Sequence, residues 1–124
     1  MESKPMSSEQ IAKLLQFMLQ PRKGERLLFL TDYSGRPSTA RLARAELLSR
    51  WYNAAALLSQ KLDFRLLPIA KCPDAPSPNA DLPSTATTHD GGRIDNLHEL
   101  IASCDIVVAM TEHSASAQIG RAHV

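Results

Sequence analysis

The hydrophobic residues near the start of the chain recur with the period of an α-helix. Ser7 and Gln10 have the spacing of a capping box, in which each side chain accepts the backbone N–H of the other residue. The apolar positions that follow share one helical face: Ile11, Leu14, Leu15, Met18 and Leu19. Pro21 and Gly24 end this pattern, so the sequence predicts an amphipathic helix of about three turns.

Three runs of apolar residues predict β-strands. The runs at 26–32 and 105–111 are apolar at successive positions, which is typical of strands buried on both faces in a parallel sheet. The run at 64–70 contains Pro68, which has no N–H to donate to a ladder. Pro68 fits an edge strand or a bulge, and we expect this strand to lie at a sheet edge.

The segments between these strands show helical periodicity. Residues 38–61 predict a long helix with one apolar face, formed by Leu48, Trp51, Ala55, Leu58 and Leu62. A shorter helix that ends near Cys104 has an apolar stripe of Ile94, Leu97, His98 and Ile101. Between the two helices, residues 71–92 are rich in proline and glycine and predict a long loop.

The predicted order of elements is α-β-α-β-α-β, which is typical of the α/β class. We expect a partial doubly wound, Rossmann-like parallel sheet with helices on both faces. Three strands and three helices cannot cover both faces and both edges of such a sheet. We therefore expect the chain to be the first part of a longer domain.

The last residues, 119–124, have a sequence that an adapter oligonucleotide can encode. Ile-Gly-Arg-Ala-His-Val is a translation of ATCGGAAGAGCACACGTC, the start of an adapter widely used in short-read sequencing. We predict that residues 1–118 form an incomplete N-terminal α/β domain. Residues 119–124 are then an adapter-derived tail that contributes nothing to the core.

Charge and composition narrow the class of protein. Across 124 residues, 14 Lys and Arg oppose 13 Asp and Glu, and the net charge of +1 argues against a binder of nucleic acid or anionic membranes. The apolar runs are far shorter than the roughly 20 residues that span a bilayer, and the first residues lack the apolar part of a secretory signal. We expect a cytoplasmic protein in which Cys72 and Cys104 are free, structural thiols.

Two loops follow the carboxyl ends of predicted strands, where open parallel sheets bind their ligands. The first loop precedes the long helix, whose terminal N–H groups favour an anion, and offers Ser34, Gly35, Arg36, Ser38 and Thr39. The second loop begins with Glu112 and His113, of which His113 is the best titratable candidate. The alternatives are an ordinary turn with a helix cap for the first loop and a solvated pair for the second.

The other histidines are weaker candidates. His89 and Asp90 lie in the loop 71–92, where one histidine and one carboxylate indicate a turn and not a metal site. His98 falls on the apolar stripe of its helix and is expected to be a half-buried core residue. The sequence contains neither Cys-x-x-Cys nor His-Glu-x-x-His. We therefore expect no catalytic residue and no metal ligand in this chain.

Two segments resemble a family of metallopeptidases. Residues 11–32 combine an amphipathic helix, the turn Gln-Pro-Arg-Lys-Gly-Glu and an apolar strand, and resemble the N-terminus of the aminopeptidase T-like (thermophilic leucyl aminopeptidase) family. Residues 102–116, in which Asp105 precedes an apolar strand and a Ser/Thr-rich loop follows it, look like the third-strand segment of that family. The resemblance implies a zinc or cobalt site in a later domain of the full-length protein, so no catalytic residue maps onto this chain.

Three functions remain open on the sequence. The leading hypothesis is a non-catalytic N-terminal domain of an aminopeptidase-like metalloenzyme. Its partners would be the missing C-terminal domain and, in the full-length protein, a second identical subunit. The alternatives are a Rossmann-like module that binds a phosphorylated or nucleotide ligand at residues 33–39, and an interaction domain that uses the loop 71–92. None of them involves nucleic acid or a membrane.

Overall fold

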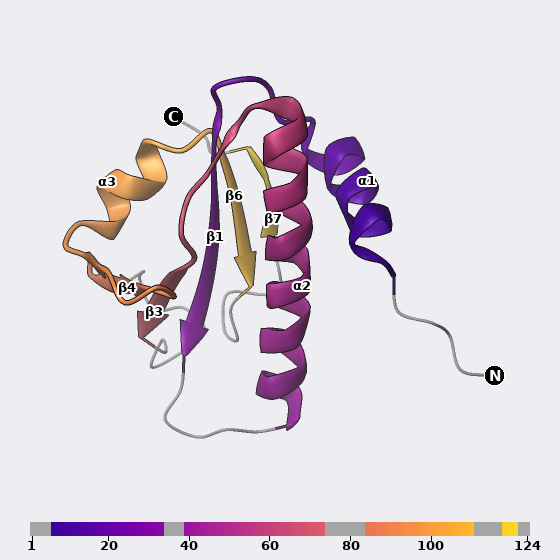
Figure 1. The fold of residues 1–124 in the computed structure, drawn as a ribbon. Coiled ribbons are helices and arrows are strands. Elements are labelled where there is room, and N and C mark those ends of the chain that lie inside the picture. The colour runs from indigo at the N-terminus through magenta and orange to yellow at the C-terminus, as the bar shows by residue number, and fades with distance from the viewer. Residues whose placement is uncertain (1–5, 34–38, 74–83, 111–117, 122–124) are drawn as a thin grey trace.

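The computed structural model describes residues 6–33, 39–73, 84–110 and 118–121 (Figure 1). The helices and strands in these ranges are, in chain order, α1 (Ser8–Leu19), β1 (Arg26–Tyr33), α2 (Thr39–Leu62), β2 (Arg65–Leu66), β3 (Ala70–Pro73), β4 (Ala86–Thr88), β5 (Arg93–Ile94), α3 (Leu97–Ala102), β6 (Ile106–Met110) and β7 (Gln118–Arg121). None of the described helices is both long and apolar enough to cross a membrane.

The strands form one mixed sheet in the order β5-β4-β3-β1-β6-β7, with β2 also paired to β1. The centre is parallel, because β1 pairs in parallel with β2 and β3 on one side and with β6 on the other. Both edges are antiparallel: β4 and β5 extend the sheet beyond β3, and β7 extends it beyond β6. The α/β class is confirmed, whereas the prediction of a wholly parallel sheet is wrong.

The proline-containing strand does not lie at an edge. β3 is bonded on one side to β1 and on the other to β4, which corrects the prediction for residues 64–70. The strand is instead interrupted: Arg65 and Leu66 pair with the start of β1, and the ladder resumes only at Ala70. Pro68 lies in this gap, where its missing N–H leaves no ladder bond unmade.

Part of the predicted loop 71–92 is a β-hairpin. β4 and β5 pair in the register Ala86↔Ile94 and Thr87↔Arg93, and Gly91 turns the chain at a φ of 93°. The threonines around β4 favour a strand, but the prolines and glycines nearby obscured this short signal in the sequence. The element order is therefore longer than the predicted α-β-α-β-α-β.

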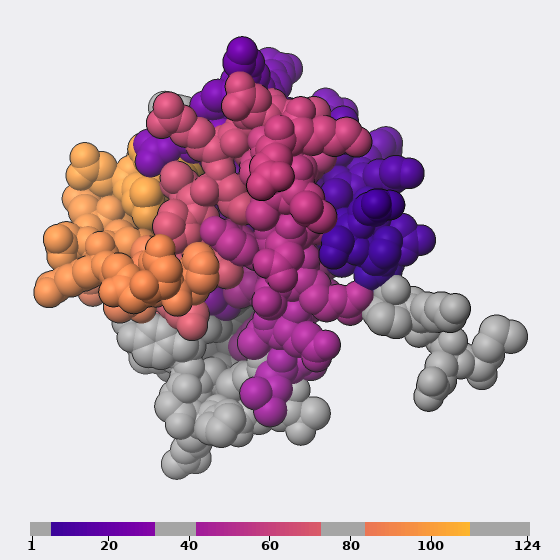
Figure 2. Space-filling model, in the orientation of Figure 1, coloured from indigo at the N-terminus to yellow at the C-terminus, as the bar shows by residue number. Residues whose placement is uncertain are grey.

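Side chains of β1 alternate between two buried clusters on opposite faces of the sheet. The α1–α2 cluster contains Ile11, Leu15, Leu19, Leu27, Phe29, Leu48, Ala54, Ala55, Leu58, Phe64, Ile69, Ile106 and Val108. The α3 cluster contains Leu28, Leu30, Ala70, Cys72, Ala86, Leu97 and Cys104. Figures 1 and 2 show α1 packed alongside α2, while α3 (orange) lies on the other side of the sheet, next to the hairpin of β4 and β5. Helices therefore lie on both faces, as predicted.

The local signals for the helices are confirmed. α1 begins at the capping box, where Ser7 Oγ accepts the N–H of Gln10 at 3.2 Å and Gln10 Oε1 accepts the N–H of Ser7 at 2.8 Å. It ends at Gln20, which adopts a left-handed conformation with a φ of 47°. The small residues Ala54 and Ala55 are fully buried on α2, which lets this helix approach the sheet closely.

Residues Gln118–Arg121 pair antiparallel with β6 as the strand β7. The backbone of residues 119–121 thus continues the sheet beyond β6, while the expectation that the tail contributes nothing to the core stays a prediction. The remaining tail residues, 122–124, lie outside the described ranges. The adapter origin and the domain division at residue 118 stay predictions.

Candidate functional site

The carboxyl ends of the three central strands, β1, β3 and β6, lie at the same end of the sheet, which we call the carboxyl edge. The parallel register aligns Tyr33 of β1 with Pro73 of β3, and Thr31 of β1 with Met110 of β6. After β1 the chain forms β3 on one side, and β6 is later placed on the other side. β1 therefore has a parallel neighbour on each side, β3 and β6, and the carboxyl ends of all three strands face the same way. Open α/β sheets bind their ligands beyond such carboxyl ends.

The segments that contain the predicted ligand-binding residues leave from this edge. Residues 34–38 connect the end of β1 to Thr39, the first residue of α2, and 111–117 follow the end of β6. Ser34, Gly35, Arg36, Ser38 and His113 lie outside the described residues. The two predicted loops therefore begin next to each other, at the ends of the neighbouring strands β1 and β6.

Thr31 was not identified from the sequence as a site residue. Among the described residues it is the polar side chain that the fold buries, with 8% of its surface exposed. It lies near the end of β1, on the face shared by Leu27 and Phe29, and therefore on the α1–α2 side of the candidate edge. A polar residue near the end of an otherwise apolar strand was the signal that could have indicated it.

His89 has a structural role in the β4–β5 turn. Its Nδ1 accepts the backbone N–H of Ile69 at 3.0 Å, and its own N–H donates to the carbonyl of Ile69, also at 3.0 Å. The imidazole lies edge-on to Tyr52, with ring centroids 5.1 Å apart. Tyr52 Oη in turn donates to the carbonyl of Leu67 at 3.0 Å. The turn interpretation of His89 is thus confirmed, with a side-chain anchor that sequence reasoning did not foresee.

The carboxylate beside His89 is held within the same turn. Thr88 Oγ1 donates to Asp90 Oδ1 and accepts the N–H of Gly92 at 2.7 Å. The hydrogen bond from Thr88 is the main cause that lowers the pKa of Asp90. Burial, with a smaller effect of Asp90, raises the pKa of Tyr52, so this phenol remains a neutral donor.

His98 is exposed on α3, which corrects the prediction of a half-buried core histidine. The helix is only six residues long and turns Leu97 into the α3 cluster, with Leu100 and Ile101 packed against that cluster. His98, which follows Leu97 directly, is placed on another side of the helix. The short stripe used for the prediction could not fix this orientation.

Both cysteines are buried thiols and neither forms a disulfide bond. Burial raises the pKa of the Cys104 thiol, and its Sγ donates to the carbonyl of Leu100 at 3.1 Å. These properties disfavour a reactive thiolate. Within the part of the chain that the structure describes, no three His, Cys, Asp or Glu side chains are grouped so that they could hold a metal ion.

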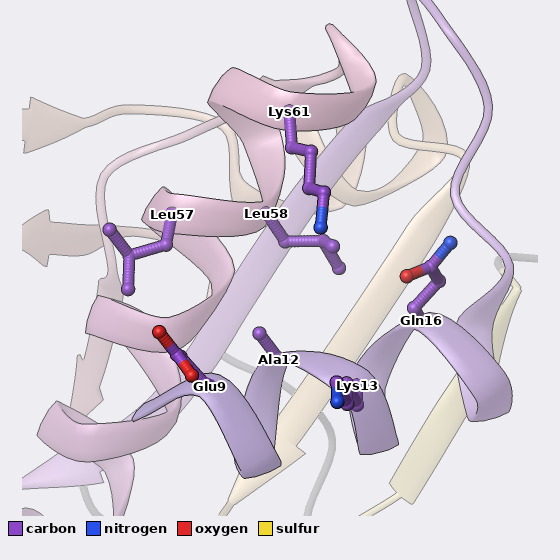
Figure 3. A pocket seen from close by; sticks show the side chains of 7 residues that line it. All are labelled: Glu9, Ala12, Lys13, Gln16, Leu57, Leu58 and Lys61. Atoms are coloured by element: carbon purple, nitrogen blue, oxygen red, sulfur yellow. The ribbon is translucent and has the colours of Figure 1, made fainter. Parts of the chain in front are cut away.

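A hollow of about 380 Å³ lies between α1 and α2 (Figure 3). Its lining residues are Glu9, Ala12, Lys13, Gln16, Leu57, Leu58 and Lys61. Leu58 is buried, whereas each charged or amide side chain of this lining is exposed. The hollow is thus a furrow between two packed helices and has no buried polar group that could orient a ligand.

Comparisons with protein-family models, with curated proteins and with solved structures give no match to this chain.

Proposed function

We propose that this chain is a ligand-binding α/β domain whose site lies at the carboxyl edge of β1 and β6. The parallel pairing of β1 with β3 on one side and β6 on the other carries the proposal, because it is the arrangement expected at the switch point of a doubly wound sheet. In a doubly wound sheet this is the position at which adjacent loops separate and leave a crevice for a ligand.

The residues of the first loop favour an anionic ligand, such as a phosphorylated or nucleotide molecule. α2 begins at Thr39, so its first N–H groups and the positive end of its dipole lie directly after the loop. Ser34 and Ser38 can donate hydroxyl hydrogen bonds, and Arg36 can bind a phosphate through two parallel N–H groups. His113 would contribute from the second loop.

Titration of the protein with inorganic phosphate and with ADP, followed by calorimetry and backbone NMR shifts, tests this proposal. We expect Arg36→Ala to weaken binding at least about tenfold, the effect of losing a charge-assisted contact. Arg22→Ala is the matched control, because Arg22 is exposed and precedes β1 at the opposite edge of the sheet. No binding of either anion at millimolar concentration, or equal losses in the two variants, would contradict the proposal.

A second candidate is the leading hypothesis from the sequence, a non-catalytic domain of an aminopeptidase T-like metalloenzyme. One observation favours it: the two resembling segments, 11–32 and 102–116, contain the neighbouring strands β1 and β6. The strand starts are bonded to one another, since Arg26 N–H donates to Asp105 Oδ2 at 2.9 Å and Asp105 N–H donates to the carbonyl of Arg26 at 3.0 Å. The resemblance therefore falls on one structural unit.

In that protein the edge of β1 and β6 would form a wall of the substrate cleft, and zinc or cobalt would bind in another domain. The natural coding sequence beyond residue 118 tests this candidate, which predicts downstream Glu, His and Asp ligands. Titration of the present chain with zinc and cobalt, with a leucine-anilide assay alongside, should show neither stoichiometric binding nor hydrolysis. Turnover that survives repurification would contradict a metal site located elsewhere.

A further inference from the structure

The imidazole of His89 replaces a backbone carbonyl in the sheet. β3 and β4 pair in the register Ala70↔Thr88, so the residue opposite Ile69 is His89. In an antiparallel ladder two such residues exchange both of their N–H···O bonds. Here the N–H of His89 donates to the carbonyl of Ile69, but the N–H of Ile69 donates to His89 Nδ1.

The hydrogen bond from Ile69 to the imidazole joins three parts of the fold at the point where the strand is interrupted. Pro68 precedes Ile69 in the gap between β2 and β3. Tyr52 of α2 contacts the same gap through its bond to the carbonyl of Leu67, and its ring lies against both the imidazole and Phe29. His89 thereby fastens the turn of the hairpin to the sheet and to α2.

The bond to Ile69 requires a neutral imidazole with an unprotonated Nδ1. Histidine side chains change their charge between about pH 5 and 8. A proton from solvent on Nδ1 removes the acceptor and leaves the Ile69 N–H facing another N–H. The Ile69 N–H then loses its hydrogen-bond acceptor next to Pro68, where the strand is interrupted.

Charged groups of both signs lie on the turn of His89 and on the neighbouring strands. Asp90 of the same turn is the neighbouring carboxylate, and its own pKa is lowered in part by His89. On α2 the facing group is Tyr52, which is neutral. The nearest charged residue on β3 is Lys71, and on β5 Arg93 is paired with Asp95 at 2.9 Å. Asp90 therefore offers the charged ring an alternative partner.

We propose that His89 is a pH-sensitive latch that fastens the turn of the β4–β5 hairpin to the interrupted strand when neutral and frees that turn when protonated. The pairing of β4 with β3 at Ala70↔Thr88 and Lys71↔Thr87 does not involve the imidazole, so the turn can loosen while the strands stay paired. The turn also keeps its own bonds. Thr88 N–H donates to the carbonyl of Gly92 at 2.9 Å, and Gly91 N–H donates to that of Thr88 at 3.1 Å. Loosening of the turn would expose the Ile69 N–H to solvent.

Amide hydrogen exchange of Ile69 between pH 8 and pH 5, corrected for the intrinsic rate, tests the latch. We expect its protection to fall about tenfold at the lower pH, which is the scale of one lost hydrogen bond. In His89→Asn an amide oxygen that does not titrate takes the place of Nδ1, so protection should no longer depend on pH. His98→Asn is the matched control and should behave as the unchanged protein, because His98 lies exposed on α3.

Imidazole nitrogen NMR on the unchanged protein provides a test that requires no variant. At pH 8 the expected tautomer of His89 carries its proton on Nε2 and accepts at Nδ1. A proton on Nδ1 at pH 8 would overturn the latch, as would Ile69 protection that is the same at both pH values. If the protection of Ile69 still depends on pH in His89→Asn, the effect belongs to another group, and the latch is rejected.

Discussion

The two faces of the sheet are covered in different ways. On one face α1 and α2, of 12 and 24 residues, cover the α1–α2 cluster. The burial of α1 follows from its amphipathic periodicity. On the other face a helix of six residues covers the α3 cluster, to which the hairpin of β4 and β5 contributes Ala86 and Ile94. A helix this short is not stable by itself, so it depends on tertiary contacts.

Polar anchors supply those contacts on the α3 side. Leu97 N–H donates to the carbonyl of Ser84 at 2.8 Å, Asn96 caps α3, and His89 fastens the hairpin to Ile69. Apolar area thus stabilises one face, whereas a few specific hydrogen bonds position the other. The comparison indicates that local opening of the native protein begins on the α3 side.

The largest expected effect comes from substitutions that compare the two clusters through adjacent residues of β1. Phe29 and Leu28 are both fully buried, on opposite faces. We expect Phe29→Ala to lower the free energy of unfolding by about 4 kcal/mol and Leu28→Ala by about 2–3 kcal/mol, since the thinner layer can collapse into the smaller cavity. Urea denaturation measures both. A greater loss for Leu28→Ala would show that the α3 side is the better packed face.

A substitution in the hairpin turn should have an intermediate effect. A Cβ on Gly92 would lie 2.6 Å from Thr88 Oγ1, so Gly92→Ala must displace the side chain that also bonds Asp90. We expect a loss of about 1–2 kcal/mol from this overpacking. Thermal unfolding of a double-mutant cycle with Thr88→Ala checks the cause, because removal of the hydroxyl should make the alanine tolerable. Additive losses would place the strain elsewhere.

The two helix caps compare the faces directly. Ser7→Ala and Asn96→Ala each remove a side chain that accepts an N–H of the first turn, which costs about 1 kcal/mol. For Asn96→Ala we expect the loss to appear as faster amide exchange confined to α3. Ser49→Ala, at an exposed position inside α2, is the control and should change stability little. If α3 keeps its protection without Asn96, the cap does not position that helix.

The smallest effect concerns the pH dependence of the hairpin. Because the pKa of Asp90 is lowered in the folded protein, its ionised form stabilises the native state. This stabilisation is fully present above the unfolded value of about 4 and is lost as the pH falls through the lower folded pKa. We expect the melting temperature of Asp90→Asn to depend slightly less on pH below pH 4 than that of the unchanged protein. An unchanged acid profile would mean that Thr88 does not hold the carboxylate in solution.

Sequence and structure agree where the signal is local. The capping box of Ser7 and Gln10 and the long apolar face of α2 arise from neighbours within a few residues, so their spacing is sufficient to predict a helix. The strands β1 and β6 were also predicted from local signals, as short apolar runs typical of strands buried on both faces. For the candidate site, the sequence identified the two loops and their residue types.

Only the tertiary structure decided which segments meet. Arg26 bonds Asp105 across 79 positions of the chain, and Ile69 bonds His89 across 20, and neither distance leaves a periodic pattern to detect. The position of β3 between β1 and β4 likewise depends on a hairpin of a few residues, whose weak propensity the surrounding prolines masked. Side-chain periodicity reports burial, while pairing partners depend on the free energy of the whole sheet. The sequence alone therefore determined the helices and central strands, and the assembled sheet determined their neighbours.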